Sequence, residues 1–255
     1  MRHIILSILL LMTAMLEAQV QEYFDREASY FHLNGAVFLQ KGEEVLLGEC
    51  YDADDTGMNH DTPFDIGSLS KQFTAAAILK LAQEGKVELD IPINTYLGEL
   101  GSKRWKKVSI QHLLTHSSGI PSLYQTEQGL PLFFPESLSI ELPDLISRFQ
   151  EAKLLHAPGI TISYSNSGYI LLAAIIEQVS GKSFERYLKE NIFHPLGMQH
   201  TQLGKLDKSA DPFYGYHPDS LRKAPVYHPS WMQGAGGIYS TINDLNNWLD
   251  VLRTD

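Results

Sequence analysis

A serine and a lysine stand three residues apart in Ser68-Leu69-Ser70-Lys71 and are the strongest candidates for chemistry in the chain. At the start of a helix, residues i and i+3 share one face, so the Lys71 amine would lie one turn beyond the Ser68 hydroxyl. A serine hydroxyl is a weak nucleophile that needs a neighbouring base, and a lysine can serve when burial destabilises its ammonium form. A helix N-terminus adds backbone N–H groups that suit a developing oxyanion. The pair therefore indicates nucleophilic attack on a carbonyl.

The same spacing occurs again in Ser220-Leu221-Arg222-Lys223, and the context separates the two matches. Ser220 lies in a proline-flanked segment that we expect to be a loop. Ser68 instead precedes residues 69–84, which are rich in alanine and leucine and predict a helix that is buried in a core and ends at Gly85. The competing interpretation is structural: Ser68 would only cap that helix, and Lys71 would extend to solvent.

A tyrosine and an asparagine form a second candidate group in Tyr164-Ser165-Asn166, the only Tyr-x-Asn triplet in the chain. The triplet follows Pro158-Gly159 and opens an apolar segment, residues 167–180, that predicts a buried helix ended by Gly181. A phenol near a cation can give up or pass on a proton, and an asparagine amide can bind a substrate carbonyl. A loop tyrosine beside an Asx turn is the structural alternative.

Five segments in order along the chain resemble the serine beta-lactamase-related hydrolases, a family that includes class C beta-lactamases, D-alanyl-D-alanine carboxypeptidases and related esterases. The resemblance covers about residues 34–255, and several motifs together are more specific than any one of them. The matching segments are FDIGSLSKQFT (64–74), LLTHSSGIP (113–121), Pro158-Gly159 through Tyr164-Ser165-Asn166-Ser167-Gly168-Tyr169, HPLGM (194–198) and GAGGIYST (234–241), with Asp244-Leu245 after it.

What the resemblance implies is a two-step acyl transfer to water. Ser68 would attack a carbonyl, and Lys71 would help to take its proton. Tyr164 would act as general acid and base, first for the leaving group and then for water, and Asn166 would orient the substrate amide. The Ser68 backbone N–H would supply half of an oxyanion hole. The implied substrate is a small molecule or peptide with an amide or ester group, such as a D-Ala-D-Ala peptide, a beta-lactam or a small ester, and no cofactor or metal is implied.

The resemblance also implies an α+β fold of the beta-lactamase/transpeptidase type, with an antiparallel sheet flanked by helices and an inserted helical region. The family's third motif, Lys-Thr-Gly or His-x-Gly on a late strand, has no counterpart in the sequence. We therefore interpret the chain as C-terminally incomplete and lacking the C-terminal strands. Loss of one oxyanion donor typically costs about 100- to 1000-fold in kcat. A non-catalytic truncated relic, or a ligand-binding module of the same fold, is the alternative function.

The composition excludes several other classes of protein. The chain has 255 residues, of which 44% are apolar and 20% charged, as in a globular domain. Its net charge of −10 and the lack of a long basic run argue against nucleic-acid binding, because phosphate contacts need clustered cations. A single cysteine, Cys50, excludes an intramolecular disulfide framework and a cysteine-rich zinc site. No motif specifies an oligomeric state.

The N-terminus predicts a secretory signal peptide over residues 1–18. A basic start, with Arg2, precedes an apolar run over residues 4–12 that is too short to span a bilayer but suits the hydrophobic region of such a peptide. No later run is long enough to span either. Residues 19–255 are therefore expected to form one hydrolase domain, periplasmic or secreted, with no membrane span. A buried N-terminal helix is the alternative.

Periodicity and turn residues outline the elements that must position the candidate groups. Residues 36–40 and 45–48, separated by a glycine-containing turn, predict a β-hairpin. Residues 121–140 and 204–230 are expected to be irregular. Residues 69–230 are expected to be mainly helical, and helices beyond those already given are predicted at 20–32, from Ser109 to about 117, at 141–150, at 183–193 and after Thr241.

Three weaker patterns have structural interpretations that we favour. His112 and His116 have a spacing that could ligate zinc, but no neighbouring glutamate completes a zincin motif. The acidic loop that begins at Asp52 starts like a calcium loop but lacks the bidentate glutamate of such a loop. The glycines within residues 234–237 do not have a phosphate-loop spacing, and they indicate a close approach of two backbones beside the site.

Overall fold

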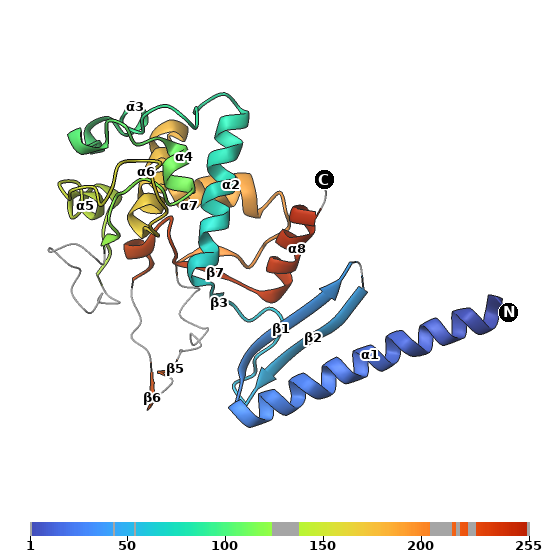
Figure 1. Cartoon of the computed structure of the whole chain (residues 1–255). Coiled ribbons are helices and arrows are strands. Elements are labelled where there is room, and N and C mark those ends of the chain that lie inside the picture. Colours follow the sequence, from blue (N-terminus) through green and yellow to red (C-terminus); the bar gives the residue numbers. More distant parts are fainter. Residues whose placement is uncertain are drawn as a thin grey trace. The chain divides into compact units, whose positions relative to one another are not determined.

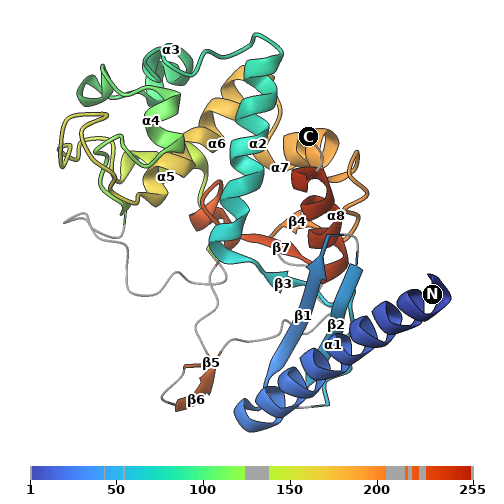
Figure 2. The ribbon, with the colours of Figure 1, turned by 45° about the vertical axis from the view of Figure 1, so that its right-hand side comes forward.

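The computed structural model describes residues 2–42, 44–53, 55–123, 138–204, 216–217, 220–223 and 228–253, with side chains described for all of these except residues 2–14 and 216–223. The chain divides into two compact units. One comprises the residues up to 63 together with those from 241 onward, and the other comprises residues 64–240. Figure 1 and Figure 2 show the elements of each unit, coloured along the chain.

The first unit is built from a β-hairpin and two helices. Its elements are α1 (Arg2–Phe31), β1 (Asn34–Lys41), β2 (Glu44–Asp52) and α8 (Ile242–Arg253). The two strands pair antiparallel, with Phe38 opposite Gly48, and the turn between them contains Gly42 at a φ of 63°, a left-handed conformation that favours glycine. Helix α1 contacts β2, and α8 contacts β1. The predicted hairpin is therefore confirmed.

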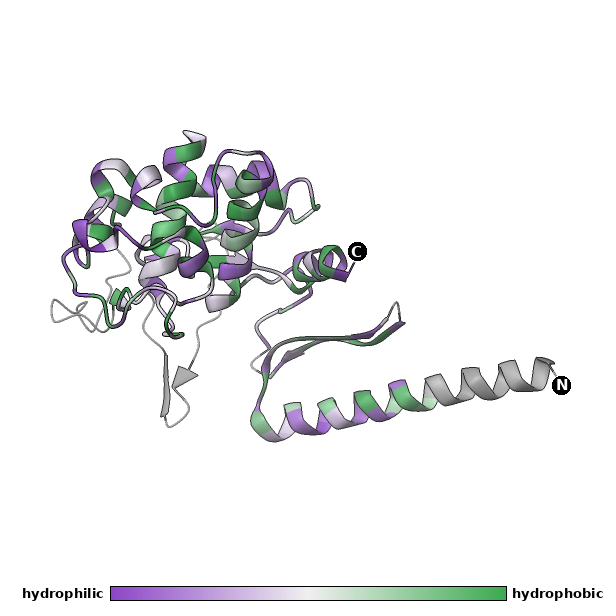
Figure 3. Ribbon diagram, turned by 45° about the horizontal axis from the view of Figure 1, so that its top comes forward, coloured by the Kyte–Doolittle hydropathy of each residue, from purple (hydrophilic) through white to green (hydrophobic). Residues whose placement is uncertain are grey.

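The helix α1 runs without a break across the boundary predicted between a signal peptide and the rest of the chain. From Met15 onward most of its side chains are exposed, and Figure 3 shows hydrophilic and hydrophobic residues alternating along this part. Tyr51 Oη on β2 donates a hydrogen bond to Asp25 over 3.2 Å; burial and this bond raise the pKa of Tyr51 to about 12. Among the described residues, no helix is both long and apolar enough to cross a bilayer. Cleavage after Ala18 stays a prediction.

The acidic loop after β2 folds around the carboxylate of Asp52. This carboxylate accepts hydrogen bonds from the backbone N–H groups of Thr56, Gly57 and Met58 and from the Thr56 hydroxyl. These bonds favour the ionised form and lower the pKa of Asp52. Donors of the loop itself therefore bind the Asp52 carboxylate. This supports the interpretation from the sequence that the loop is a structural acidic turn rather than a calcium site.

A helix that is apolar on every side forms the centre of the second unit. This helix, α6 (Asn166–Ser180), has ten consecutive buried residues from Ser167 to Ile176. A helix of that kind must be covered all round. Its neighbours are α2 (Ser70–Gln83), α3 (Asn94–Leu97), α4 (Ile110–Leu114), α5 (Leu142–Ser147) and α7 (Phe184–Leu188), and both ribbon views show α2 running beside it (Figures 1 and 2).

Capping residues explain where these helices begin and end. The Ser165 hydroxyl accepts a hydrogen bond from Gly168 N in the first turn of α6, and Gly181 ends that helix at a φ of 68°. Ser109 and His112 form a reciprocal capping box at the start of α4. The helices predicted at residues 69–84, 167–180 and 183–193 are confirmed, the last of them ending in a π-helical turn over Lys189–Phe193.

A small antiparallel sheet lies at the N-terminal end of α2. Its central strand is β7 (Ile238–Ser240), between β3 (Phe64–Asp65) and β4 (Gln202–Leu203). Ile66 N donates to the Ile238 carbonyl over 3.0 Å, and Ile238 N donates to the Ser70 hydroxyl over 3.4 Å. The strand β7 thus holds the chain on both sides of Ser68.

The second Ser-x-x-Lys match lies on a strand rather than in a loop, so that prediction was wrong. Residues Ser220–Lys223 form β6, which pairs antiparallel with β5 (Tyr216–His217). Two short segments that lie close together in the sequence can pair locally, although the proline-rich sequence favoured an irregular loop. A strand does not provide the one-turn spacing that relates Ser68 to Lys71. Residues 124–137 and most of the segment 204–230, also predicted as loops, lie outside the described residues.

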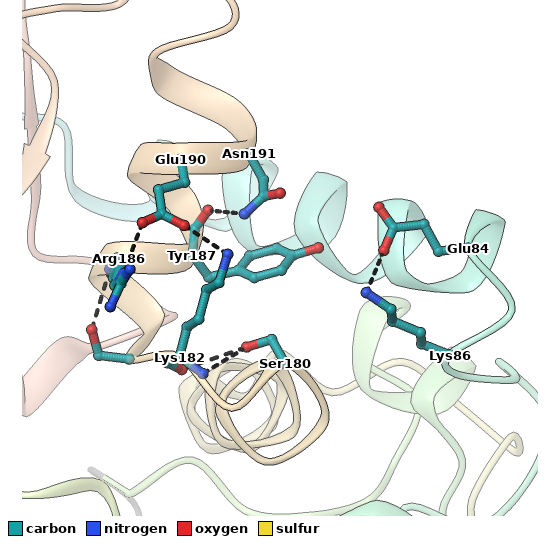
Figure 4. A network of polar contacts seen from close by, with 9 residues as sticks. Glu84, Lys86, Ser180, Lys182, Arg186, Tyr187, Glu190 and Asn191 are labelled. Atoms are coloured by element: carbon teal, nitrogen blue, oxygen red, sulfur yellow. Dashed lines mark hydrogen bonds and ion pairs between the residues drawn. The ribbon is translucent and has the colours of Figure 1, made fainter.

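Glu190 is the centre of an ion-pair network on the surface of the second unit (Figure 4). Its carboxylate accepts from Lys182 Nζ over 2.6 Å and from Arg186 Nε over 2.7 Å. These bonds favour the ionised form and lower the pKa of Glu190 to about 2. Because this pKa lies below the ordinary value of 4.5, the network stabilises the fold above that value and loses its contribution as the pH falls toward about 2.

Glu190→Gln is therefore expected to lower the Tm at about pH 7, and the difference from the wild type should shrink as the pH falls below about 4.5. Thermal unfolding followed by circular dichroism at a series of pH values measures this. Glu185→Gln is the matched control, because Glu185 lies on the same helix and forms no ion pair with any described residue. A Glu190→Gln difference that stays constant across the pH series would contradict the role of the network.

Candidate active site

Ser68 lies in a short 3-10 turn, Gly67–Leu69, that leads directly into α2. The Ser68 side chain is exposed, and Leu69 occupies the N-cap position of α2 with no side-chain cap. The interpretation of Ser68 as a helix cap is therefore wrong. Gly67 adopts a φ of 51°, and its N–H donates to the Asp65 carboxylate over 2.9 Å. This bend places the Ser68 hydroxyl at the N-terminus of the helix, free for other contacts.

Two other side chains reach the Ser68 hydroxyl, one from nearby in the sequence and one from far along it. Lys71 Nζ donates to Ser68 Oγ over 3.1 Å, and the oxygen atoms of Ser68 and Tyr164 are 2.8 Å apart. Lys71 comes from the same helical turn, whereas Tyr164 lies 96 positions later, in the loop before α6. A nucleophile within hydrogen-bond reach of both an amine and a phenol has the geometry of acyl transfer.

The amine of Lys71 is held in a largely apolar environment. Lys71 is only 7% exposed, and its Nζ lies 5.0 Å from the ring centre of Tyr164 and 5.6 Å from that of Tyr169. Its strongest described polar contact is a hydrogen bond of 2.6 Å to the carbonyl oxygen of Ala235. Among the described residues, no carboxylate forms an ion pair with it. Desolvation lowers the pKa of Lys71, against a smaller opposing effect of Tyr164. The lower pKa increases the fraction of Lys71 that is in the neutral amine form.

A close approach of two backbones presents the Ala235 carbonyl to Lys71. Gly234, at a φ of 83°, passes so near α6 that an added Cβ would lie 2.3 Å from the carbonyl oxygen of Tyr169. The Gly234 carbonyl accepts a hydrogen bond of 2.8 Å from the Thr74 hydroxyl of α2. The predicted role of the glycines in this segment is confirmed, and the segment contacts both helices that carry the site.

Asn166 is the fourth residue predicted for the site, and it lies at the first position of α6, two residues after Tyr164. It takes no part in the described hydrogen bonds among Ser68, Lys71 and Tyr164. Its Oδ1 is buried and has no hydrogen-bond partner among the described residues. Because this oxygen is closed to an entering molecule, a contact between Asn166 and a substrate would use the amide NH2 group.

The two histidines considered as metal ligands each have a ring nitrogen in a hydrogen bond to a backbone N–H. His112 Nδ1 accepts from Ser109 N over 3.1 Å, and His116 Nδ1 accepts from Ser165 N over 3.2 Å. The first bond belongs to the capping box of α4. The second connects the end of α4 to the residue that follows Tyr164. Among the described residues, no group of three or more His, Cys, Asp or Glu side chains is arranged to hold a metal ion.

Comparison with known proteins identifies the family to which this arrangement belongs. The family model described as Beta-lactamase matches residues 27–255, which is most of the chain. The chain belongs to the beta-lactamase family. This confirms the family that the motifs predicted, and the beta-lactamase-type chemistry of the site is taken up below as a proposal.

Individual relatives within the beta-lactamase family agree with this assignment. The chain is 34% identical over 187 residues to PbpX of Bacillus subtilis (strain 168), a protein named for penicillin binding. The match covers 72% of this chain and 44% of the relative. The chain is 31% identical over 194 residues to a beta-lactamase of Yersinia enterocolitica, covering 76% of this chain and 47% of that protein. The chain thus spans about half the length of these curated relatives.

A solved structure supports the fold. An octameric penicillin-binding protein homologue from Pyrococcus abyssi superposes with a TM-score of 0.77 at 31% identity, over 92% of this chain and 55% of that one. The predicted fold class, a mixed α+β fold of the beta-lactamase/transpeptidase type, is therefore confirmed. The described strands of this chain pair antiparallel and are few and short.

Sequence reasoning missed two contributors to this beta-lactamase-family site. The Ala235 carbonyl acts through the backbone, which any residue type provides, so only the flanking glycines signalled it. Tyr169 lies near the start of α6, five residues after Tyr164, and its hydroxyl donates to the Leu114 carbonyl over 3.1 Å. Its position at the start of an apolar helix made it look like an ordinary core residue.

Proposed function

We propose that the chain is a serine hydrolase that transfers an acyl group from an amide or ester to Ser68 and then to water. The observation that carries this proposal is the pair of short contacts at Ser68 Oγ, 3.1 Å to the Lys71 amine and 2.8 Å to the Tyr164 phenol. Membership of the beta-lactamase family supports it independently.

In the first step, Ser68 Oγ attacks the substrate carbonyl carbon as its proton moves to the neutral Lys71 amine. The lowered pKa of Lys71 raises the neutral fraction of that amine at a given pH. The Ser68 backbone N–H is the proposed donor to the oxyanion that forms. Tyr164 then gives a proton to the leaving nitrogen or oxygen, the bond to the leaving group breaks, and an ester of Ser68 remains.

In the second step, a water molecule attacks the ester of Ser68. Tyr164 takes a proton from that water, the bond between the acyl carbon and Ser68 Oγ breaks, and Ser68 recovers its proton from Lys71. The phenol suits both steps because it is half exposed, and so faces the entering molecule while it contacts the nucleophile. Asn166 is proposed to orient the substrate amide, with its side-chain NH2 group donating to the substrate carbonyl.

The proposed substrates are a D-Ala-D-Ala peptide, a beta-lactam or a small ester. The names of relatives, one for penicillin binding and one for beta-lactamase activity, support the beta-lactam class. We also propose that the protein is exported, because the apolar run over residues 4–12 and the single cysteine suit a secreted or periplasmic protein.

Covalent labelling tests the proposed function. Incubation with a fluorophosphonate, and separately with a penicillin, should give an adduct in intact-mass spectra that disappears in Ser68→Ala. Ser220→Ala, which removes the serine of the other Ser-x-x-Lys match, is the matched control and should label like the wild type. Absence of an adduct in folded wild-type protein would overturn the hydrolase proposal in favour of a non-catalytic binding module.

A further inference from the structure

His116 makes three contacts that bracket Tyr164. Its carbonyl oxygen accepts the N–H of Ser163 over 2.8 Å, and its ring nitrogen Nδ1 accepts the N–H of Ser165 over 3.2 Å. Its ring packs against the Tyr164 ring, with 4.4 Å between the ring centres. One residue therefore holds the backbone on both sides of Tyr164 and also the side chain of Tyr164 itself.

These contacts matter because Tyr164 has few other constraints. Its side chain is 50% exposed, and it lies in a loop before α6 rather than within a helix. Its hydroxyl must nevertheless stay within hydrogen-bond reach of Ser68 Oγ, at 2.8 Å. A general acid or base displaced by about 1 Å can lose about 100-fold in rate, so the support behind the phenol matters as much as the phenol.

The support is itself fixed to two helices. The His116 ring packs against Tyr169 of α6, with 5.1 Å between ring centres, and the Tyr169 hydroxyl donates to the Leu114 carbonyl of α4. His116 follows α4 at a φ of 55°, a left-handed conformation that is strained for a residue with a side chain. The surrounding contacts must offset that strain, as is common at functional positions.

We propose that His116 is a positioning residue for Tyr164, and that it does this only while its imidazole is neutral with the proton on Nε2. Nδ1 must lack a proton to accept the Ser165 N–H, so protonating the ring would set two N–H groups against each other. The Ser165 bond would break, and the phenol would move away from Ser68. The catalytic part of this inference rests on the proposed function; the coupling between His116 and Tyr164 does not.

The polar and titratable groups that face the ring come from α2, from α6 and from the loop before α6. These are the Lys71 amine from α2, the phenols of Tyr164 and Tyr169, and the Ser165 N–H that points at Nδ1. Burial and the charge of Lys71 lower the pKa of His116, and no described carboxylate opposes them. The imidazole is therefore neutral at neutral pH, and the arrangement opens only in acid.

A titration of the full chain tests the coupling without needing activity. Tyrosine labelled with ¹³C at Cζ gives one NMR resonance per ring, and Tyr164→Phe assigns that of Tyr164. As the pH falls from neutral into acid, the Tyr164 resonance should shift with the same midpoint as the His116 imidazole resonance, which lies below the ordinary value of 6.5. The shift should vanish in His116→Asn, since asparagine tolerates a positive φ but does not titrate. His194→Asn, at an exposed histidine in the same unit, is the control and should leave the shift intact.

Fluorophosphonate labelling of Ser68 adds a second measurement. His116→Asn should slow labelling about 10- to 100-fold at neutral pH, because the phenol is no longer held near the nucleophile. A Tyr164 resonance that does not follow the His116 titration overturns the inference, whether or not Ser68 reacts. If the Tyr164 resonance follows the His116 titration but Ser68 does not react, the positioning role of His116 is supported and only the hydrolase proposal is contradicted. The wild-type titration decides the question even if His116→Asn fails to fold.

Discussion

Lys71→Met is expected to slow the labelling of Ser68 by a fluorophosphonate about 100- to 10,000-fold, the usual contribution of general-base catalysis. Methionine has nearly the length of lysine and suits the buried surroundings of Lys71, which is 7% exposed. The substitution therefore removes the proton acceptor 3.1 Å from Ser68 Oγ while it largely keeps the packing against Tyr164 and Tyr169. The rate of labelling is measured by quenching the reaction at a series of times and determining the labelled fraction by intact-mass spectrometry.

The pH dependence of labelling separates a base from a merely structural lysine. Only the neutral amine can accept the Ser68 proton, so the wild-type rate should rise with pH through the lowered pKa of Lys71. The rate of Lys71→Met should lack this rise. Equal pH profiles for the two proteins would exclude Lys71 as the base and leave Tyr164, which is 2.8 Å from the same hydroxyl, as the acceptor.

The stability of Lys71→Met serves as the control for folding. The pKa of Lys71 is lowered in the folded chain below its ordinary value of 10.5, so between these two values the unfolded chain binds more protons. Wild-type stability should therefore rise with pH in that window, and burial of the ammonium destabilises the fold below it. Methionine removes that cost, so Lys71→Met should have a Tm at neutral pH equal to or above that of the wild type. An inactive variant with a higher Tm would show that the site trades stability for chemistry.

Local rules made much of the site predictable. The spacing of Ser68 and Lys71 needs only one helical turn, and the apolar character of residues 69–84 placed that helix in a core. The apolar run over residues 167–180 and the glycine that ends it, Gly181, marked α6, so the Tyr-x-Asn triplet could be placed at its start. Each of these inferences depends on residues less than about five turns apart, where sequence patterns carry direct physical meaning.

The contacts that complete the site depend on tertiary packing, which sequence patterns do not encode. The Ala235 carbonyl reaches Lys71 from 164 positions away, and a backbone oxygen has no residue-type signature. His116 adopts a positive φ that its residue type disfavours, because hydrogen bonds to Ser163 and Ser165 hold it there. The family resemblance marked the segment around His116 but gave no reason for the histidine, whereas the structure supplies one.

Gly234→Ala is expected to destabilise the fold strongly. At a φ of 83° an alanine is strained by about 1–2 kcal/mol. Its Cβ would also lie 2.3 Å from the Tyr169 carbonyl and 2.8 Å from the Ala173 side chain, so the segment must move away from α6. Overpacking of this kind typically costs a further ~1–3 kcal/mol.

Gly85→Ala isolates the steric part of that cost. Gly85 ends α2 at a φ of 70°, and an added Cβ there meets nothing within 4 Å, so it carries the same conformational strain without the clash. For a chain of this size, about 1–3 kcal/mol corresponds to about 2–12 °C in Tm, and Gly234→Ala should melt lower than Gly85→Ala by that amount. Similar melting temperatures for the two variants would mean that the segment around Gly234 moves away from α6 without a loss of stability.

The same pair of variants tests whether the segment serves the chemistry as well as the fold. Movement of Gly234 carries the Ala235 carbonyl away from Lys71 and breaks the bond to Thr74, so the amine loses its shortest described contact. Gly234→Ala should therefore slow Ser68 labelling even at temperatures where it is fully folded, while Gly85→Ala labels at the wild-type rate. If folded Gly234→Ala also labels at the wild-type rate, the Ala235 carbonyl does not orient the amine, and Lys71 is held by Ser68 and the two tyrosine rings alone.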